Sequence, residues 1–303
     1  MPAMTADPGV TLTADHLIQL RAGAMSGARS RARSRARAIT ALPGSFVVKR
    51  RGAGQEIADI RAYVAGDDIR HLDRGSTART GQLHMRVFQE ERDRVTILVA
   101  DFRPGMLWGT ERALLSVAGA EALAILGWRA VDEGGRVGLL ALTAQGPVVI
   151  RARGRATGML RVIGGLVRAH AQALEAGIAP RPPELDQALA GLDRIAGPGA
   201  EIVLASNFED TGPGLYDLLA QLDRRRHLRV LHVADGQSAA LPPGTYPLGF
   251  RDGGAALARV GKGSGAVADP GRSRLAMVPD QVPQVAIDAG SAPDIIRRDL
   301  AAP

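Results

Sequence analysis

The sequence lacks several features that define whole classes of protein. It contains no cysteine, which excludes disulfide bonds, thiolate metal sites and a cysteine nucleophile. Aromatic residues make up only 3% of the chain, which disfavours the base-stacking surfaces of proteins that bind single-stranded nucleic acid. The longest apolar runs, such as "VTILVA" and "VGLLAL", are far shorter than the roughly 20 residues needed to cross a bilayer.

The start of the chain, "MPAMTADPGV", has neither the basic residues nor the apolar centre of a signal peptide. We therefore expect a cytoplasmic protein without membrane insertion. At 303 residues, of which 46% are apolar, the chain is long enough for one large or two modest domains with a real core.

The positive charge of the chain comes almost entirely from arginine, because Lys49 and Lys262 are the only lysines behind a net charge of +7. The densest basic stretch, "ARSRARSRARA", places an arginine at every second position from Arg29 to Arg37. On a helix this spacing spreads the charges over opposite faces. We favour a solvated helix over a contact with an anion, and we do not expect nucleic-acid binding; the anionic contact stays open as the alternative.

The composition divides the chain into four regions. Residues 1–45 form an N-terminal extension, with a helix over "LTADHLIQLRAGAM", Thr13 as its N-cap, and then the arginine run. Residues 46–93 are charged and rich in turn residues, which indicates an ordered loop up to the strand "LHMRVF". Residues 94–235 alternate between strands and helices. Residues 236–303 are rich in Gly, Pro and Ala, and we interpret them as a subdomain or as an edge of the same fold.

The alternating region predicts an α/β fold with a mainly parallel sheet and helices on both faces. Its strands are nearly continuous in Val, Ile and Leu, as expected for strands that are buried on both sides. The predicted strands are "VTILVAD", "RVGLLALTA", "PVVIRA", "AEIVLASN" and "LRVLHVAD". The predicted helices are "ERALLSVAGAEALAILGWRAVDEG", "TGMLRVIGGLVRAHAQAL", "ELDQALAGLDRI" and "GLYDLLAQLDRRR".

Ligands of such sheets collect at the carboxyl ends of the strands, where this chain places Asp101 after one strand and Asn207, Glu209 and Asp210 after another. The sequence has no phosphate-binding loop, no His-Glu-x-x-His zinc motif and no Gly-x-Ser-x-Gly nucleophile elbow. No acid–base or nucleophile–base pair has a recognisable spacing, so we do not expect an enzyme and we expect no cofactor.

The stretch from "GQEIADIRAYVAGDDIRHLD" through "ARTGQLHMRVF" to "VTILVADFRPGM" resembles the signature of the Domain of Unknown Function 58 family, whose members carry a von Willebrand factor A-like domain. The resemblance implies that fold for residues 45 to 235. It also implies a loop-rich insertion ahead of the sheet. The matching positions are Glu56, Asp59, Arg61, Tyr63, Gly66, Asp67, Asp68, Arg70, Asp73, Ala78, Arg79 and Asp101.

The resemblance implies a metal site with most of its ligands missing. In such domains an Asp-x-Ser-x-Ser loop, a threonine and a second aspartate hold Mg²⁺, and a partner's carboxylate completes the shell. Here Asp101 remains, while Arg103 and Gly105 replace the serines. The threonine falls at Pro183 or Glu184, and the second aspartate is Asn207. Because a guanidinium repels a cation, we expect no functional metal.

Two alternatives concern individual motifs. Arg103 either pairs with Asp101 and supplies the charge of the missing cation, or points into solvent, and the sequence leaves both open. For "GDDIRHLD" we favour scaffolding of the loop by ion pairs and Asx turns over direct contact with a partner.

Three functions remain. The resemblance favours a non-enzymatic adaptor, because such proteins are similar to those that work beside MoxR-type AAA+ ATPases, which remodel or mature client protein complexes. The second is a metal-dependent adhesion module that still binds a divalent cation. The third is a nucleic-acid binder that acts through the arginine run, whose binding would depend steeply on salt.

Overall fold

The computed structural model describes residues 7, 9–21, 57–64, 68–88, 94–176, 182–236, 244–249, 255–260 and 277–301. The chain forms two compact units. The first, which we call the sheet unit, comprises residues 1–31 and 94–303, and the second, the signature unit, comprises residues 32–93. Among the described residues, no helix is both long enough and apolar enough to cross a membrane.

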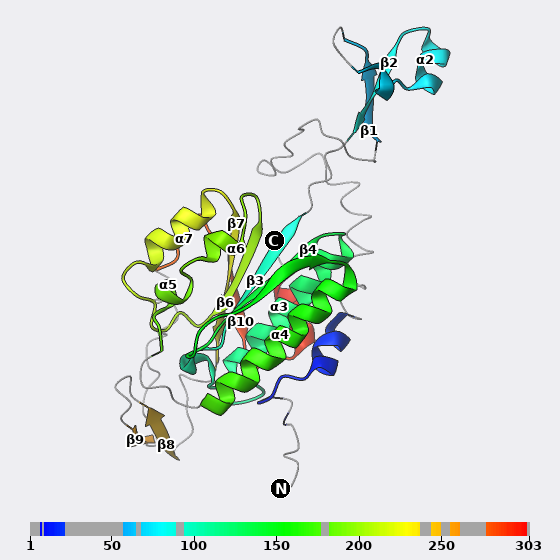
Figure 1. The fold of residues 1–303 in the computed structure, drawn as a ribbon. Coiled ribbons are helices and arrows are strands. Elements are labelled where there is room, and N and C mark those ends of the chain that lie inside the picture. The colour runs from blue at the N-terminus through cyan, green and yellow to red at the C-terminus, as the bar shows by residue number, and fades with distance from the viewer. Residues whose placement is uncertain are drawn as a thin grey trace. The chain divides into compact units, whose positions relative to one another are not determined.

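The sheet unit is built on six strands in the order β10-β7-β6-β3-β4-β5 (Figure 1). All neighbouring strands are parallel except β4 and β5, which are antiparallel. β3 lies in the interior of the sheet between β6 and β4, and the predicted parallel α/β sheet is confirmed. The strands are β3 (Val95–Asp101), β4 (Arg136–Leu142), β5 (Val148–Gly154), β6 (Glu201–Ser206), β7 (His227–Ala234) and β10 (Gln284–Asp288).

Helices cover both faces of this sheet (Figure 1). One face packs against α3 (Leu115–Asp132), α4 (Arg155–Ala176) and α9 (Pro293–Asp299). The other packs against α5 (Leu185–Ala188), α6 (Leu192–Ile195) and α7 (Leu215–Asp223). The sequence predicted one helix over α5 and α6, but Gly191 adopts a left-handed conformation with φ of 87° and separates them. Its missing side chain permits that conformation.

The start of the chain packs onto α3. Residues 14–21 are helical, and the Thr13 hydroxyl accepts a hydrogen bond from the His16 backbone N–H at 3.3 Å, as predicted for an N-cap. Leu17 is fully buried, and its carbonyl accepts a hydrogen bond from the Trp128 indole at 3.0 Å. Residues 9–21 are therefore part of the sheet unit's core, and the prediction of an N-terminal extension was wrong for them. The arginine run lies outside the described residues.

A buried carboxylate strengthens this contact. Glu121 in α3 is fully buried; its oxygens accept hydrogen bonds from Arg112 at 2.8 and 3.0 Å, and Oε1 lies 2.7 Å from His16 Nε2. Burial alone would raise the pKa of Glu121, but the hydrogen bonds from His16 and Arg112, together with their charges, lower it below its ordinary value. The N-terminal helix is thus fixed by apolar burial and by a buried ion-pair cluster.

The signature unit contains regular structure where the sequence predicted loop. β1 (Ile57–Ala62) pairs antiparallel with β2 (His84–Phe88), and the segment between them forms η1 (Ile69–His71) and α2 (Arg74–Thr80). The prediction of an ordered loop was wrong for this segment because Asp68 and Asp73 cap two short helices, a local signal that charge content conceals.

The C-terminal region divides between two places. β8 (Gly244–Gly249) and β9 (Ala255–Val260) form an antiparallel pair. β10 extends the central sheet beside β7, and α9 packs against α3. The end of the chain is therefore an edge of the main fold, which was one of the two interpretations of its composition.

Candidate functional site

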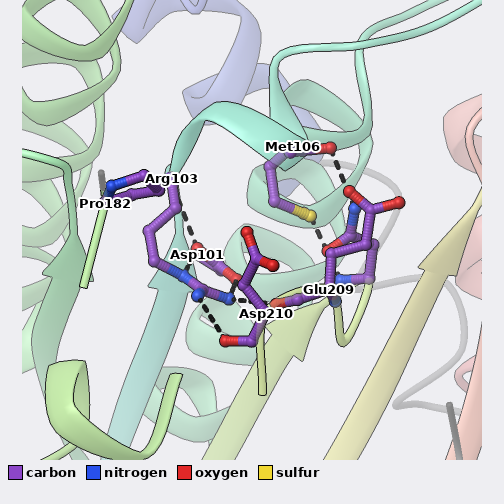
Figure 2. Close-up of a pocket in the computed structure, with 8 residues that line it drawn as sticks. Asp101, Arg103, Met106, Pro182, Glu209 and Asp210 are labelled. Carbon is purple, nitrogen blue, oxygen red and sulfur yellow. Dashed lines mark hydrogen bonds and ion pairs between the residues drawn. The ribbon is translucent and has the colours of Figure 1, made fainter. Parts of the chain in front are cut away.

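Asp101 ends β3 at the carboxyl edge of the sheet, where the sequence analysis predicted a site. It lies next to the loops that follow β6 and that precede α5, and Figure 2 shows Arg103 reaching back towards Asp101 and Asp210. The local sequence explains this position, since β3 is a run of buried apolar residues that ends in the aspartate. Parallel neighbours bring their own carboxyl ends to the same edge.

Arg103 and Asp101 form a buried, bidentate ion pair. Arg103 Nε donates to Asp101 Oδ1 at 3.0 Å, and Nη2 donates to Oδ2 at 2.8 Å. The Arg103 backbone N–H also donates to Oδ1 at 3.0 Å. The Arg103 side chain is only 4% exposed and that of Asp101 is fully buried. Of the two alternatives for Arg103, pairing with Asp101 is confirmed.

The remaining N–H groups of the guanidinium bind backbone carbonyls from two other loops. Nη1 donates to the carbonyls of Pro183 and Asp210 at 3.2 and 3.0 Å, and Nη2 donates to the carbonyl of Glu209 at 3.0 Å. A guanidinium has five N–H groups, and all five are therefore bonded within the protein. Arg103 joins three loops, as a metal ion would.

Ser206 also contacts Asp101, although it was not among the predicted site residues. Its hydroxyl donates to Asp101 Oδ2 at 2.7 Å and accepts the Phe208 backbone N–H at 3.0 Å. Its position offered a signal, because it is the last residue of β6, which runs parallel to β3. We call Asp101, Arg103, Ser206 and the three carbonyls the arginine site.

The other predicted metal positions lie beside the arginine site but bond to one another. Asn207 Nδ2 donates to the Gly105 carbonyl at 2.8 Å, and Asn207 Oδ1 accepts the Glu209 backbone N–H at 3.1 Å. A Cβ atom on Gly105 would lie 2.5 Å from Glu209 Oε2. A serine there would therefore displace the Glu209 carboxylate, which occupies the space where the family pattern has a hydroxyl.

The electrostatics of the arginine site keep Arg103 charged. Burial alone would lower the pKa of Arg103, but the charge and hydrogen bonds of Asp101 raise it above its ordinary value, and Asp210 and Glu209 add to this. Both Asp101 oxygens face this cation, and Gly105 offers no hydroxyl. These residues are a poor fit for Mg²⁺, which needs several oxygen ligands in near-octahedral geometry. Among the described residues, no cluster of three or more His, Asp or Glu side chains could hold a metal ion.

The predicted motif residues of the signature unit have several positions. Asp59 and Arg61 lie in β1, Tyr63 follows it, and Asp73 is buried as the N-cap of α2. Asp68, Arg70 and Arg79 are exposed. Glu56, Gly66 and Asp67 lie outside the described residues.

A serine and a histidine meet inside the sheet unit, which raises the question of nucleophilic catalysis. Ser116 Oγ lies 3.0 Å from His170 Nε2, and the Phe102 ring packs edge-on against the imidazole. Burial lowers the pKa of His170 to about 4. The two residues are 0% and 1% exposed, which leaves no approach for a substrate. The pair is therefore a hydrogen bond of the core.

The comparison with known families confirms the resemblance found in the sequence. The model of the family described as "Protein of unknown function DUF58" matches residues 59–252, which is more than half of the chain. The chain belongs to the DUF58 family. The match begins within β1 of the signature unit, includes the arginine site and ends between β8 and β9.

Curated relatives share part of the sequence of the chain. It is 36% identical over 129 residues to the uncharacterised proteins Rv1480 of Mycobacterium tuberculosis (strain H37Rv) and Mb1516 of Mycobacterium bovis. The matched stretch is 40% of this chain and 39% of each relative, so it spans about two fifths of their length.

Solved structures with some similarity cover 69% of this chain. One is the conserved hypothetical protein BatB from Bacteroides thetaiotaomicron, with 17% identity, 97% of that chain covered and a TM-score of 0.43. Another is the SpRpn10 VWA domain, with 10% identity, 95% covered and a TM-score of 0.37. These values are low. The strand order, in which β3 is interior and the chain builds outwards on both sides, is that of a doubly wound α/β sheet, the class to which the von Willebrand factor A-like fold belongs.

Proposed function

We propose that the protein is a non-enzymatic adaptor that binds other proteins without the help of a divalent cation. The arginine site is the observation that supports this proposal, since all five guanidinium N–H groups are bonded within the chain. A metal-dependent adhesion module needs an open coordination position for its partner's carboxylate. Here the charge that would attract that carboxylate is neutralised by Asp101 and enclosed by carbonyls.

The partner that the family resemblance suggests is a MoxR-type AAA+ ATPase, which acts on a client protein complex in the cytoplasm. Membership of the DUF58 family supports this part of the proposal. The two-unit organisation is also suited to an adaptor, because one unit can engage the ATPase while the other engages the client.

The proposal is tested with the purified full chain and the purified MoxR-type ATPase from the same genome. We expect saturable binding in sedimentation or interferometry at a fixed concentration of Mg²⁺ and nucleotide. The chain alone should not hydrolyse the nucleotide. Failure of the two proteins to bind would contradict the adaptor proposal in this form.

The metal-dependent alternative has a separate test on the chain alone. Calorimetric titration of the chain with Mg²⁺ or Mn²⁺ should give no saturable heat, because the arginine site already holds a cation. A stoichiometric binding isotherm would instead support the metal-dependent adhesion module.

A further inference from the structure

The two described aspartates of the motif "GDDIRHLD" bind within their own unit. An Asp68 carboxylate oxygen accepts the Arg70 backbone N–H at 3.0 Å, and an Asp73 oxygen accepts the Ser76 backbone N–H at 2.7 Å. Such bonds cap the first turn of a helix. These carboxylates therefore act as scaffold, which was the favoured interpretation of the motif.

The arginines of the same segment are not held by contacts of this kind. Arg70, Arg74 and Arg79 are exposed, and none of them forms an ion pair with any residue that the structure describes. Residues 57–64 and 68–88 contain five arginines but only three aspartates, of which two are caps. The segment consequently presents positive charge to its surroundings.

Apolar side chains are exposed beside these arginines. Ile69 is 70% exposed, Val64 61% and Leu83 46%. Among residues 62–64 and 68–85, whose burial is described, Met85 is the single buried apolar side chain. Exposed apolar groups among charged ones are typical of protein interfaces.

Backbone contacts place the residues that carry these side chains near one end of the strand pair. The Tyr63 N–H donates to the Leu83 carbonyl at 2.8 Å, which extends the ladder just beyond the end of β1. η1 follows shortly after, and Leu72 at its end pairs with Met85 of β2. We call this end of the unit the display surface; it comprises Val64, Ile69, Arg70, Arg74, Arg79 and Leu83.

We propose that the display surface is the docking site for an acidic segment of a partner protein that also carries apolar side chains. Arginine pairs with carboxylates through two parallel hydrogen bonds, which gives both attraction and orientation. The exposed Ile69, Val64 and Leu83 need apolar surface to cover them, and a nucleic-acid backbone does not provide it. Charge complementarity and this apolar component together select a protein.

This inference rests on the proposed adaptor function and names the surface through which it acts. The usual contact point of a von Willebrand factor A-like domain, the metal at the edge of the sheet, is replaced here by an arginine with no N–H group left to offer. The display surface has three guanidinium groups that are exposed to solvent. Recognition of an acidic partner is thereby moved from the sheet unit to the signature unit.

The test compares two variants of the full chain in binding to the MoxR-type ATPase. The first is the triple variant Ile69→Asp/Arg70→Glu/Arg79→Glu on the display surface. The matched control is Leu160→Asp/Arg161→Glu/Arg168→Glu on α4, where the leucine is 44% exposed and both arginines are also exposed. Both variants replace two exposed arginines with glutamate and one exposed apolar side chain with aspartate, so they change the net charge equally.

We expect the display-surface variant to bind at least about tenfold more weakly than the parent, whereas the control variant binds like the parent. Hydrogen exchange of α2 must stay as slow as in the parent, since Asp73 and Met85 are unchanged. A milder variant, Arg70→Gln/Arg79→Gln, provides a second binding measurement if α2 unfolds in the triple variant. This variant should also bind more weakly than the parent. Its binding should also depend less on salt than that of the parent.

The outcomes separate this inference from the proposed function. Equal binding by the parent and both display-surface variants would overturn the inference and leave the adaptor function intact. No binding by the parent would overturn the adaptor function and this inference with it. If the parent bound duplex DNA or single-stranded RNA and the display-surface variants did not, the assignment of a protein partner would be overturned.

Discussion

The arginine site and the display surface use the same kind of side chain in opposite ways. The side chain of Arg103 is 4% exposed, and its five N–H groups donate to one carboxylate and three carbonyls. Arg70 and Arg79 are exposed, and neither forms an ion pair with a described residue. The difference lies in the neighbours. In the arginine site, strand ends meet at a buried aspartate, and the arginine pairs with it inside the protein. On the display surface, the neighbouring aspartates cap helices, and the arginines stay available to a partner.

The largest predicted effect is the loss of the internal cation. Replacing Arg103 with Ser leaves the Asp101 carboxylate buried and unpaired, which should lower the free energy of unfolding by about 3–5 kcal/mol. The same replacement at Arg70 should change it by less than about 0.5 kcal/mol, because that side chain is exposed. Urea unfolding of the two variants and the parent gives both values.

A double variant sharpens this prediction. In Arg103→Ser/Asp101→Asn, no charge remains unpaired, so the loss should be smaller than in Arg103→Ser alone. A loss that is equal or greater in the double variant would show that packing of the arginine, and not its charge, stabilises the loops.

The second predicted effect is a dependence of the free energy of unfolding on pH, which arises from Glu121 in another buried ion-pair cluster of the sheet unit. Its pKa is lowered in the folded protein, so its contribution is fully present above the pKa of the unfolded chain. That contribution is lost as the pH falls through the lower, folded pKa. Unfolding of the parent and of Glu121→Gln should therefore differ at pH 7 and converge in acid. A constant difference across this range would contradict the prediction.

Ser206 should have a smaller effect than Arg103 within the same site. In Ser206→Ala, Asp101 loses one of its donors and the Phe208 N–H loses its acceptor, while the arginine contacts persist. We expect a loss of about 1–3 kcal/mol in urea unfolding. Ser206→Thr, which keeps the hydroxyl, is the conservative control and should lose less.

The smallest predicted effect is the loss of a helix cap in the signature unit. Replacing Asp73 with Ala removes the cap of α2 and should cost about 1 kcal/mol locally. Hydrogen exchange of residues 74–80 should become faster, and exchange of β3 and β6 should not change. Faster exchange in β3 would show that the two units are energetically coupled, which would weaken the contrast between them.

Much of the fold of the sheet unit could be predicted from the sequence, because the patterns that indicate its strands are local and recur along the chain. The runs of Val, Ile and Leu in β3, β4 and β6 predict buried parallel strands, and the aspartate that ends β3 predicts the edge at which a site forms. The pairing of Arg103 with Asp101 was one of two open alternatives. The burial of Arg103 decides between them. That burial depends on loops whose contacting residues are 80 and 106 positions away in the sequence, and the sequence alone does not show that these loops meet.

The sequence concealed other features for identifiable reasons. α2 and η1 are too short for periodicity, and only their aspartate caps mark them. The docking of the N-terminal helix depends on Glu121, which looks like a surface residue until Arg112 and His16 are seen to enclose it. Ser206 is one hydroxyl in an apolar strand, and its role depends on the register between β6 and β3.

The central claim is that Arg103 takes the place of a divalent cation, and thermal melting in the presence of EDTA or millimolar Mg²⁺ tests it most directly. The parent should melt at the same temperature in both solutions. Arg103→Ser should melt several degrees lower in EDTA and should recover part of that loss with Mg²⁺, because the exposed Asp101 then binds the metal weakly. A parent whose midpoint rises by several degrees with Mg²⁺, or an Arg103→Ser variant that melts like the parent in EDTA, would contradict the claim.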